Sequence, residues 1–168
     1  MDSKKEPRHT IAVTVDNLPG VLSRVTGLFS GRGFNIESLC VAETMDPAVS
    51  RITIVSTGDE QITEQIIKQL HKLINVITVV DLSEVPHVER DMVLVRVKAE
   101  DKSRAEVLRI ADIFRCRVVD VSASTYTLEI TGNHEKTKAV LDLLKNHGIQ
   151  EVVRTGTLAI QRSRKTDN

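Results

Sequence analysis

The sequence DNLPGVLSRVTGLFSGRGFNIESL, residues 16–39, decides the fold of the first half of the chain. Just before it, Ile11, Val13 and Val15 alternate with Ala12 and Thr14 at the period of a strand with one buried face. Within it the period changes to that of a helix, which we expect to begin near Pro19, because proline suits the first helical position, and to end in Gly31-Arg32-Gly33. The helical apolar positions are Val21, Leu22, Val25, Leu28 and Phe29.

The turn between this strand and helix offers backbone amides to an anion. A helix that begins at Pro19 has Leu18 at its N-cap, where leucine has no oxygen to satisfy the first amides. The N–H groups of Gly20 and Val21 are then uncapped unless Asn17 reaches back, and glycine lets a ligand approach the main chain. Such a helix end attracts a carboxylate by roughly 0.3–1 kcal/mol when exposed and about 2 kcal/mol when sheltered. The same residues also suit an ordinary turn with no ligand.

Composition indicates a soluble globular protein. The 168 residues fit one large or two small domains, and they are 40% hydrophobic and 27% charged, with no tryptophan. Lys+Arg and Asp+Glu each number 23, so net charge predicts no attraction to nucleic acid or membrane. The polar N-terminus has no signal core, and no apolar run could span a bilayer. The two cysteines, Cys40 and Cys116, make neither a disulfide framework nor a metal knuckle, so we expect a cytoplasmic protein.

The rest of the first half continues the pattern of strand and helix. Alternating residues predict strands at 39–42 and 51–55, paired as a hairpin, and another strand at 76–82. Between them Gly58-Asp59 caps a helix whose apolar stripe is Ile62, Ile66, Leu70, Leu73 and Ile74. The order strand, helix, strand, strand, helix, strand is the split ferredoxin-like arrangement, in which right-handed crossovers place the first and third strands at the centre.

The second half repeats this order after a polar linker at residues 83–87. We predict strands at 92–97, 118–121, 126–130 and 152–153, a helix that Ser103 and Glu106 open as a capping box, and a helix through Val140, Leu143 and Leu144. The expected fold is α+β: two ferredoxin-like βαββαβ domains, at residues 8–84 and 88–162, with flexible tails at 1–7 and 163–168. Units of this size bury limited apolar area, so docking between domains or subunits should add stability.

Few residues suggest chemistry. The five histidines show no metal-ligand spacing and no nucleophile-like setting, and there is no phosphate-binding glycine loop, so we expect no catalytic residue and no metal site. RNA-binding modules share this element order but stack bases on aromatic residues of the sheet, and only three Phe and one Tyr are present. An acylphosphatase-like enzyme stays open as an alternative, although Arg24 falls too far inside the helix to act as the phosphate-binding arginine.

Residues 16–39 resemble the opening of an ACT domain, the amino-acid-binding regulatory module. More narrowly, the chain resembles the regulatory small subunit of acetohydroxyacid synthase, also called acetolactate synthase. The likeness covers nearly the whole chain, with one departure at Gly31, where relatives commonly carry Arg or Gln. It continues through Ser50-Arg51-Ile52-Thr53-Ile54, Gly58-Asp59-Glu60, Gln65-Ile66, Lys68-Gln69-Leu70, His87-Val88-Glu89-Arg90, Ile113-Phe114-Arg115 and Arg154-Thr155-Gly156.

The resemblance implies a homodimer whose paired first domains bind valine at their interface. The chain would bind the large catalytic subunit, activate it and confer feedback inhibition by valine, while thiamine diphosphate, FAD and Mg would belong to that partner. Valine, leucine and isoleucine are not separated by the sequence. The alternatives are a free-standing ACT sensor with another partner, the acylphosphatase-like enzyme, and a metal-responsive regulator. Carried over by position, the expected valine-binding residues are Asn17, Gly20, Val21, Leu22, Asn35 and Ile36.

Overall fold

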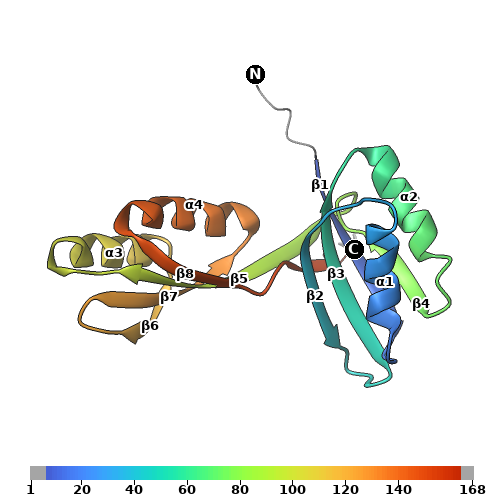
Figure 1. Ribbon diagram of the computed structural model, residues 1–168, viewed down its shortest axis with the longest axis horizontal. Helices are drawn as coiled ribbons and strands as arrows, with labels where there is room; N and C mark the ends of the chain where they lie inside the picture. Colours follow the sequence, from blue (N-terminus) through green and yellow to red (C-terminus); the bar gives the residue numbers. More distant parts are fainter. Residues whose placement is uncertain (1–6, 164–168) are drawn as a thin grey trace, which may run out of the picture. The chain divides into compact units, whose positions relative to one another are not determined.

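The computed structural model describes residues 7–163, apart from the side chains of Asp101 and Lys102. The chain forms two compact units, whose elements Figure 1 colours along the sequence. Unit 1 comprises the residues up to Val88 together with those from Thr157 onward, and unit 2 comprises Glu89–Gly156. Apart from residues 7 and 163, the predicted flexible tails lie outside the described residues.

Unit 1 has the predicted order of elements. Its strands form one antiparallel sheet in the order β2-β3-β1-β4, so the first and third strands are central, as predicted. Each strand and helix is longer or shorter than its sequence pattern by a few residues, because element ends depend on contacts outside the pattern. The elements are β1 (Arg8–Asp16), α1 (Val21–Ser30), β2 (Ile36–Glu43), β3 (Val49–Thr57), α2 (Glu60–Leu70) and β4 (Val76–Asp81).

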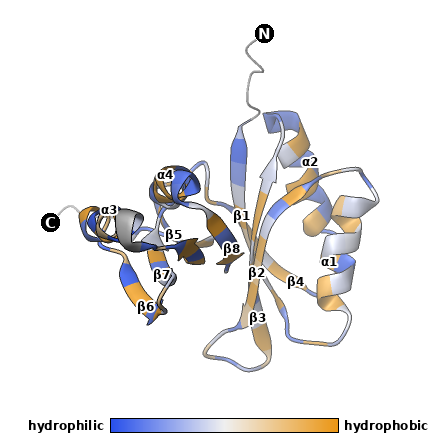
Figure 2. Cartoon of the chain, turned by 60° about the vertical axis from the view of Figure 1, so that its left-hand side comes forward, coloured by the Kyte–Doolittle hydropathy of each residue, from blue (hydrophilic) through white to orange (hydrophobic). Residues whose placement is uncertain are grey.

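The core of unit 1 lies between the sheet and its two helices. Ile11 and Val13 of β1 are fully buried and pack in one cluster with Phe29 of α1 and Leu70 of α2. Figure 2 shows apolar residues along the strands, whereas the helices carry both apolar and polar residues, as amphipathic helices do. The prediction that Ile74 belongs to the apolar stripe of α2 was wrong: the helix ends at Leu70, and Ile74 is 93% exposed in the turn that follows.

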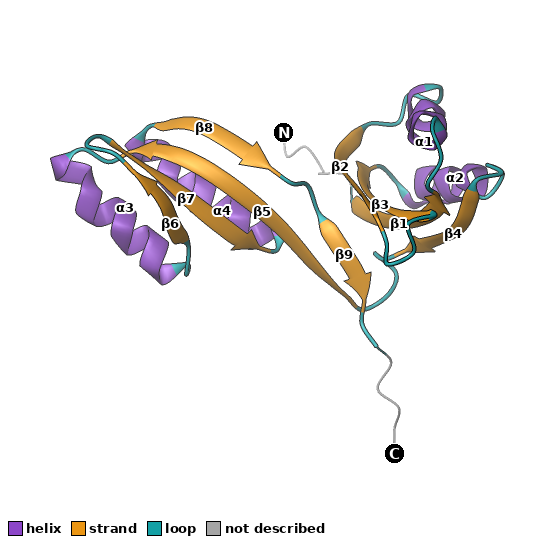
Figure 3. Ribbon diagram, turned by 90° about the horizontal axis from the view of Figure 1, so that it is seen from below, coloured by secondary structure: helices purple, strands orange, loops and turns teal. Residues whose placement is uncertain are grey.

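The other face of the unit 1 sheet is covered by the end of the chain, which we call the C-terminal strap (residues 157–161). The strap contains β9 (Leu158–Gln161), a strand that the sequence analysis missed and that pairs with β5 (His87–Lys98), as Figure 3 shows. Ala159 packs against Ala12 and Leu82, and its carbonyl accepts a hydrogen bond of 3.0 Å from Arg51. Residues 157–162, which the sequence analysis placed in the second domain, therefore lie with unit 1, because their packing partners are there.

Unit 2 repeats the fold with one antiparallel sheet in the order β6-β7-β5-β8. Its core cluster includes Val93 and Val95 of β5, Leu128 and Ile130 of β7, and Leu144 of α4. The predicted capping box was wrong: α3 begins after Glu100, with no side-chain cap, and Ser103 Oγ donates to the Glu100 carbonyl. The elements are β5 (His87–Lys98), α3 (Asp101–Ile113), β6 (Arg117–Val121), β7 (Thr125–Gly132), α4 (His134–Leu144), a 3-10 turn (Lys145–His147) and β8 (Ile149–Arg154).

Candidate functional site

A type II turn joins β1 to α1. The Val21 amide donates to the Leu18 carbonyl at 3.3 Å, which closes a four-residue turn, and Gly20 at its third position has φ +84° and ψ −8°. Proline at the second position and glycine at the third are the residues this turn type selects. The helix therefore begins at Val21 with Gly20 as N-cap, and the predicted N-cap at Leu18 was wrong because the Pro-Gly pair builds a separate turn ahead of the helix.

The first amides of α1 are open. Within residues 7–163, the amides of Gly20, Leu22 and Ser23 donate no hydrogen bond, and no side chain caps the helix. The sequence analysis named the Gly20 amide correctly as an open donor, named the Val21 amide wrongly, and missed the amides of Leu22 and Ser23. Recognising Pro-Gly as a type II turn would have moved the predicted helix start to Val21. Because the first turn carries no acidic residue, nothing on the helix competes with an incoming anion.

Hydrogen bonds hold the turn against its neighbours. The Asn17 amide donates to the Ala48 carbonyl at 2.7 Å, and its side-chain Nδ2 donates to the Pro47 carbonyl at 2.8 Å. Asn17 therefore does not reach back to cap α1, and its Oδ1 faces no donor among the described residues. Asp16 accepts a hydrogen bond from Asn75, which in turn accepts one from Arg24. The open amides thus sit on a turn that the β2–β3 hairpin positions.

The apolar side chains at the turn divide into two groups. Val21 is 4% exposed and belongs to the core cluster, so its side chain is not available to a ligand. Leu18 and Leu22 are 58% and 41% exposed and flank the open amides. An aliphatic ligand could therefore contact two leucines while its carboxylate meets the helix end.

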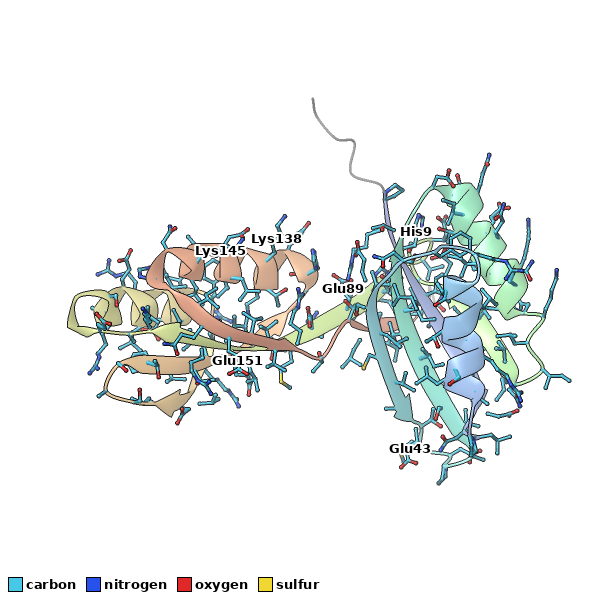
Figure 4. The ribbon with its side chains drawn as sticks, viewed as in Figure 1. His9, Glu43, Glu89, Lys138, Lys145 and Glu151 are labelled. Atoms are coloured by element: carbon cyan, nitrogen blue, oxygen red, sulfur yellow. The ribbon has the colours of Figure 1, made fainter. Side chains whose placement is uncertain are left out.

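Asn35 and Ile36 lie at the opposite end of the same sheet. Ile36 pairs with Ser56 at one end of β3, whereas Glu43, at the other end of β2, pairs with Ser50, close to the Asn17 turn. Glu43 lies seven positions after Ile36 along the strand, a distance of roughly 23 Å. Figure 4 labels His9 and Glu43, which mark these two ends of unit 1. One copy of the chain therefore does not bring the two groups of predicted site residues together.

Asn35 and Ile36 have different surroundings. Ile36 is half-buried and packs on the core cluster, whereas Asn35 is exposed and its carbonyl accepts a 2.8 Å hydrogen bond from Ser56 Oγ. Ile36 is the first residue of β2, and Asn35 precedes it. β2 is an edge strand, because no strand in the described part of the chain pairs with its outer side. The exposed edge is a surface on which a further strand can pair.

The described residues contain no cluster of three or more His, Cys, Asp or Glu side chains that could hold a metal ion. No helix of residues 7–163 is long and apolar enough to cross a membrane. Cys40 and Cys116 are free thiols, and burial raises the pKa of Cys116 although nearby Lys136 lowers it, so this thiol is a poor nucleophile at neutral pH.

Two protein-family models match the chain. The "AHAS small subunit-like ACT domain" matches residues 11–78, and the "Small subunit of acetolactate synthase" matches residues 90–163. The acetolactate synthase small subunit of Haemophilus influenzae is 49% identical over 94% of this chain and 98% of its own. The probable acetolactate synthase small subunit of Archaeoglobus fulgidus is also 49% identical, over 94% of this chain and 99% of its own.

A solved structure has the same fold along nearly the whole chain. The crystal structure of the acetolactate synthase small subunit from Thermotoga maritima superposes with a TM-score of 0.85 at 38% sequence identity, covering 94% of this chain and 99% of that one. The family models, the relatives and this structure agree on the family, and the solved structure agrees with the fold of the chain. The chain belongs to the acetolactate synthase small-subunit family.

Proposed function

We propose that this chain is the regulatory subunit of acetolactate synthase, which binds the large catalytic subunit, raises its activity and makes it sensitive to feedback inhibition by valine. Beyond family membership, one observation carries the proposal: three open amides at the start of α1, one of which belongs to Gly20 at φ +84°. Thiamine diphosphate, FAD and Mg belong to the catalytic partner in this proposal.

The open amides suit the carboxylate of an amino acid. Donors from Gly20, Leu22 and Ser23 and the positive end of the helix dipole favour a negative group by up to about 2 kcal/mol. The ammonium group requires acceptors, and the Oδ1 atoms of Asn17 and Asn35 can supply them. Contact with Leu18, Leu22 and Ile36 would hold a branched side chain. Selection of valine over leucine or isoleucine is modest, because one methylene is worth about 1–3 kcal/mol.

A two-fold dimer formed along β2 joins the two halves of this site. Antiparallel pairing of β2 with the β2 of a second copy places the Ile36 end of one strand beside the Glu43 end of the other. Asn35 of one copy then lies near the Asn17 turn of its partner, and two equivalent valine sites form. Pairing along β4, the other edge of the sheet, cannot do this, because Asn35 lies on the β2 side.

Valine between two copies acts on the enzyme through a shift between quaternary states. A ligand that contacts both copies stabilises their association by mass action. If one state of the complex is less active and binds valine better, valine favours it, with a coupling of typically 1–3 kcal/mol. The coupling is reciprocal, so binding of the catalytic subunit must alter the affinity for valine.

The first test is acetolactate formation by the purified catalytic subunit, titrated with this chain with and without valine. We expect activation that valine reverses. No activation, with valine still bound, would assign the chain to another partner and contradict the proposed function.

Mixed dimers test the shared site. We expect Asn17→Ala and Asn35→Ala each to abolish most valine inhibition while activation stays largely intact. When the two variants are mixed, each hybrid dimer has one doubly altered site and one intact site, so valine inhibition should partly return. A site within one copy predicts no recovery on mixing, and that result would exclude the β2 dimer site.

A further inference from the structure

An acidic depression lies at the corner of unit 1 where β1, α2 and β4 meet. It has a volume of about 250 Å³ and is lined by seven residues. Four of them are carboxylates, of which only Glu64 has a cationic partner in the described residues, Lys68 at 3.0 Å on the solvent side. We call this depression the acidic corner; its lining residues are His9, Glu60, Thr63, Glu64, Ile67, Asp81 and Glu84.

His9 is a buried group with unmet hydrogen-bonding capacity in the wall of the acidic corner. It is 9% exposed, and its Nε2 lies 3.1 Å from the Gly58 carbonyl oxygen, a contact that places the proton on Nε2. Its Nδ1 is enclosed and has no partner in the described structure. Buried polar atoms are usually paired, so this orphaned nitrogen, on a residue that lines the depression, points to a donor that reaches it when the surrounding side chains shift on binding. Figure 4 labels His9 at its end of unit 1.

The equivalent corner of unit 2 is neutralised within the chain. Ile11 of β1 pairs with Asp81, and Val93 of β5 pairs with Arg154, so Asp81 and Arg154 hold the same place in their sheets. Arg154 bonds Asp91, which is 2% exposed and precedes Val93 as His9 precedes Ile11. Unit 2 therefore supplies its own guanidinium, whereas unit 1 has an acid at that place.

We propose that the acidic corner binds the side chain of an arginine from a partner protein segment. The carboxylates are too far apart to form a metal-binding cluster, which suits a larger group with several donors. A guanidinium has five N–H donors in a planar fork, enough for carboxylates on several elements and for a ring nitrogen. The Thr63 methyl and Ile67 can contact the aliphatic stem. This site is separate from the proposed valine site, because Asn17 lies beyond the other end of β1 and β3 lies between β1 and the β2 edge that carries Ile36.

The test uses NMR titration of the full chain with N-acetyl-arginine methylamide. We expect saturable shifts of the Gly58 and Thr63 amides and of the His9 imidazole nitrogens. The citrulline analogue keeps the shape of the side chain but carries no charge, and it should not bind. Agmatine, which carries a guanidinium but no peptide groups, distinguishes the source of the guanidinium. Weaker binding of agmatine than of N-acetyl-arginine methylamide supports a protein segment as occupant, and tighter binding of agmatine overturns that assignment.

Charge variants complete the test. Glu60 and Glu84 accept no hydrogen bond from any described residue, so the double variant Glu60→Gln, Glu84→Gln should leave the fold intact. Because it removes two carboxylates from the lining, it should weaken arginine binding about tenfold. The matched control, Glu129→Gln with Glu135→Gln in unit 2, has the same change of net charge and should leave binding unchanged. Equal weakening by both pairs, binding of the citrulline analogue, or unmoved His9 signals would overturn the proposal.

Discussion

The two units share one fold and differ at the positions to which we assign binding sites. Their registers define the equivalent residues: Ile11 pairs with Ile54 and Asp81, and Val93 pairs with Ile130 and Arg154. The repeated β-strand pattern builds both sheets, but among the described residues the Pro-Gly turn occurs only before α1, whereas α3 begins after Glu100 without such a turn. The shared pattern specifies the scaffold, and the unshared residues specify what each unit can bind.

The cores of the two units use different side chains in the same layers. The Phe29 carbonyl accepts from the Phe34 amide at the end of α1, and the Ala111 carbonyl accepts from the Cys116 amide at the end of α3, so Phe29 and Ala111 are equivalent. Both are almost fully buried. Unit 1 takes a large aromatic side chain from a helix, whereas unit 2 takes Tyr126 from a strand.

Exchanging the equivalent core residues should have the largest effect. Phe29→Ala leaves a cavity and should lower the free energy of unfolding of unit 1 by about 3–5 kcal/mol. The reverse change, Ala111→Phe, overpacks unit 2 and should cost about 1–3 kcal/mol. Amide hydrogen exchange followed by NMR reports each unit separately. A change of less than 1 kcal/mol for Phe29→Ala would show that unit 1 can collapse around the site.

The next largest effect should come from the buried ion pair of unit 2. Asp91→Asn leaves Arg154 without its carboxylate and should destabilise unit 2 by about 2–3 kcal/mol, the low end for such pairs because the Arg154 side chain is 41% exposed. Exchange rates of amides in β5 and β8 give the measurement.

The control is the exposed pair Asp142–Lys145 in the same unit. The hydrogen bond from Lys145 lowers the pKa of Asp142, so any stabilisation is present at neutral pH and is lost as the pH falls through that lowered pKa. Solvent screening keeps it small, and Asp142→Asn should show no measurable change at pH 7. A loss equal to that of Asp91→Asn would contradict the role of burial.

A substitution in the C-terminal strap tests which of the two units the strap stabilises. Ala159→Asn buries an amide against Ala12 and Leu82 and should destabilise unit 1 by about 1–2 kcal/mol, although residue 159 follows unit 2 in the chain. Asparagine is chosen over aspartate because a carboxylate could pair with Arg51. The neighbour Leu158 is 51% exposed, and Leu158→Asn should change little. Exchange that accelerates in unit 2 alone would contradict the assignment of the strap to unit 1.

The helix ends provide the smallest contrast. Gly33 after α1 has φ +70°, and its equivalent after α3 is Arg115 at φ +54°. Gly33→Ala should destabilise unit 1 by about 1 kcal/mol through backbone strain alone, because a Cβ there would meet nothing within 4 Å. Arg115→Gly relieves the same strain and should stabilise unit 2 by about 0.5 kcal/mol.

A helix-interior glycine serves as the control for these two changes. Gly27→Ala also meets nothing within 4 Å, but this residue lies within α1, so it should stabilise unit 1 by about 0.5–1 kcal/mol. Thermal unfolding of each variant measures the sign. Equal effects of Gly33→Ala and Gly27→Ala would exclude the backbone explanation.

Local signals predicted much of this protein. Strand alternation and helical stripes were sufficient for the order of elements and the central strands, and Asp59 caps α2 as expected, its Oδ1 accepting from the Ile62 amide at 2.8 Å. The errors arose where two local rules competed. Proline is common at the start of a helix, which led to the predicted N-cap at Leu18, whereas Pro19 and Gly20 form a type II turn. The capping-box pattern at Ser103 lies inside a helix that has already begun after Glu100.

The sequence by itself determined the two α+β units, the family and the presence of a turn between β1 and α1, because each depends on residues close together in the chain. Only the tertiary structure decided three other features: the return of residues 157–161 to the back of unit 1, the placement of Asn17 and Asn35 at opposite ends of one sheet, and the assembly of the acidic corner from β1, α2 and β4. These depend on contacts between distant residues, for which the chain has no local period, and on the free edge of β2, which one copy leaves unpaired.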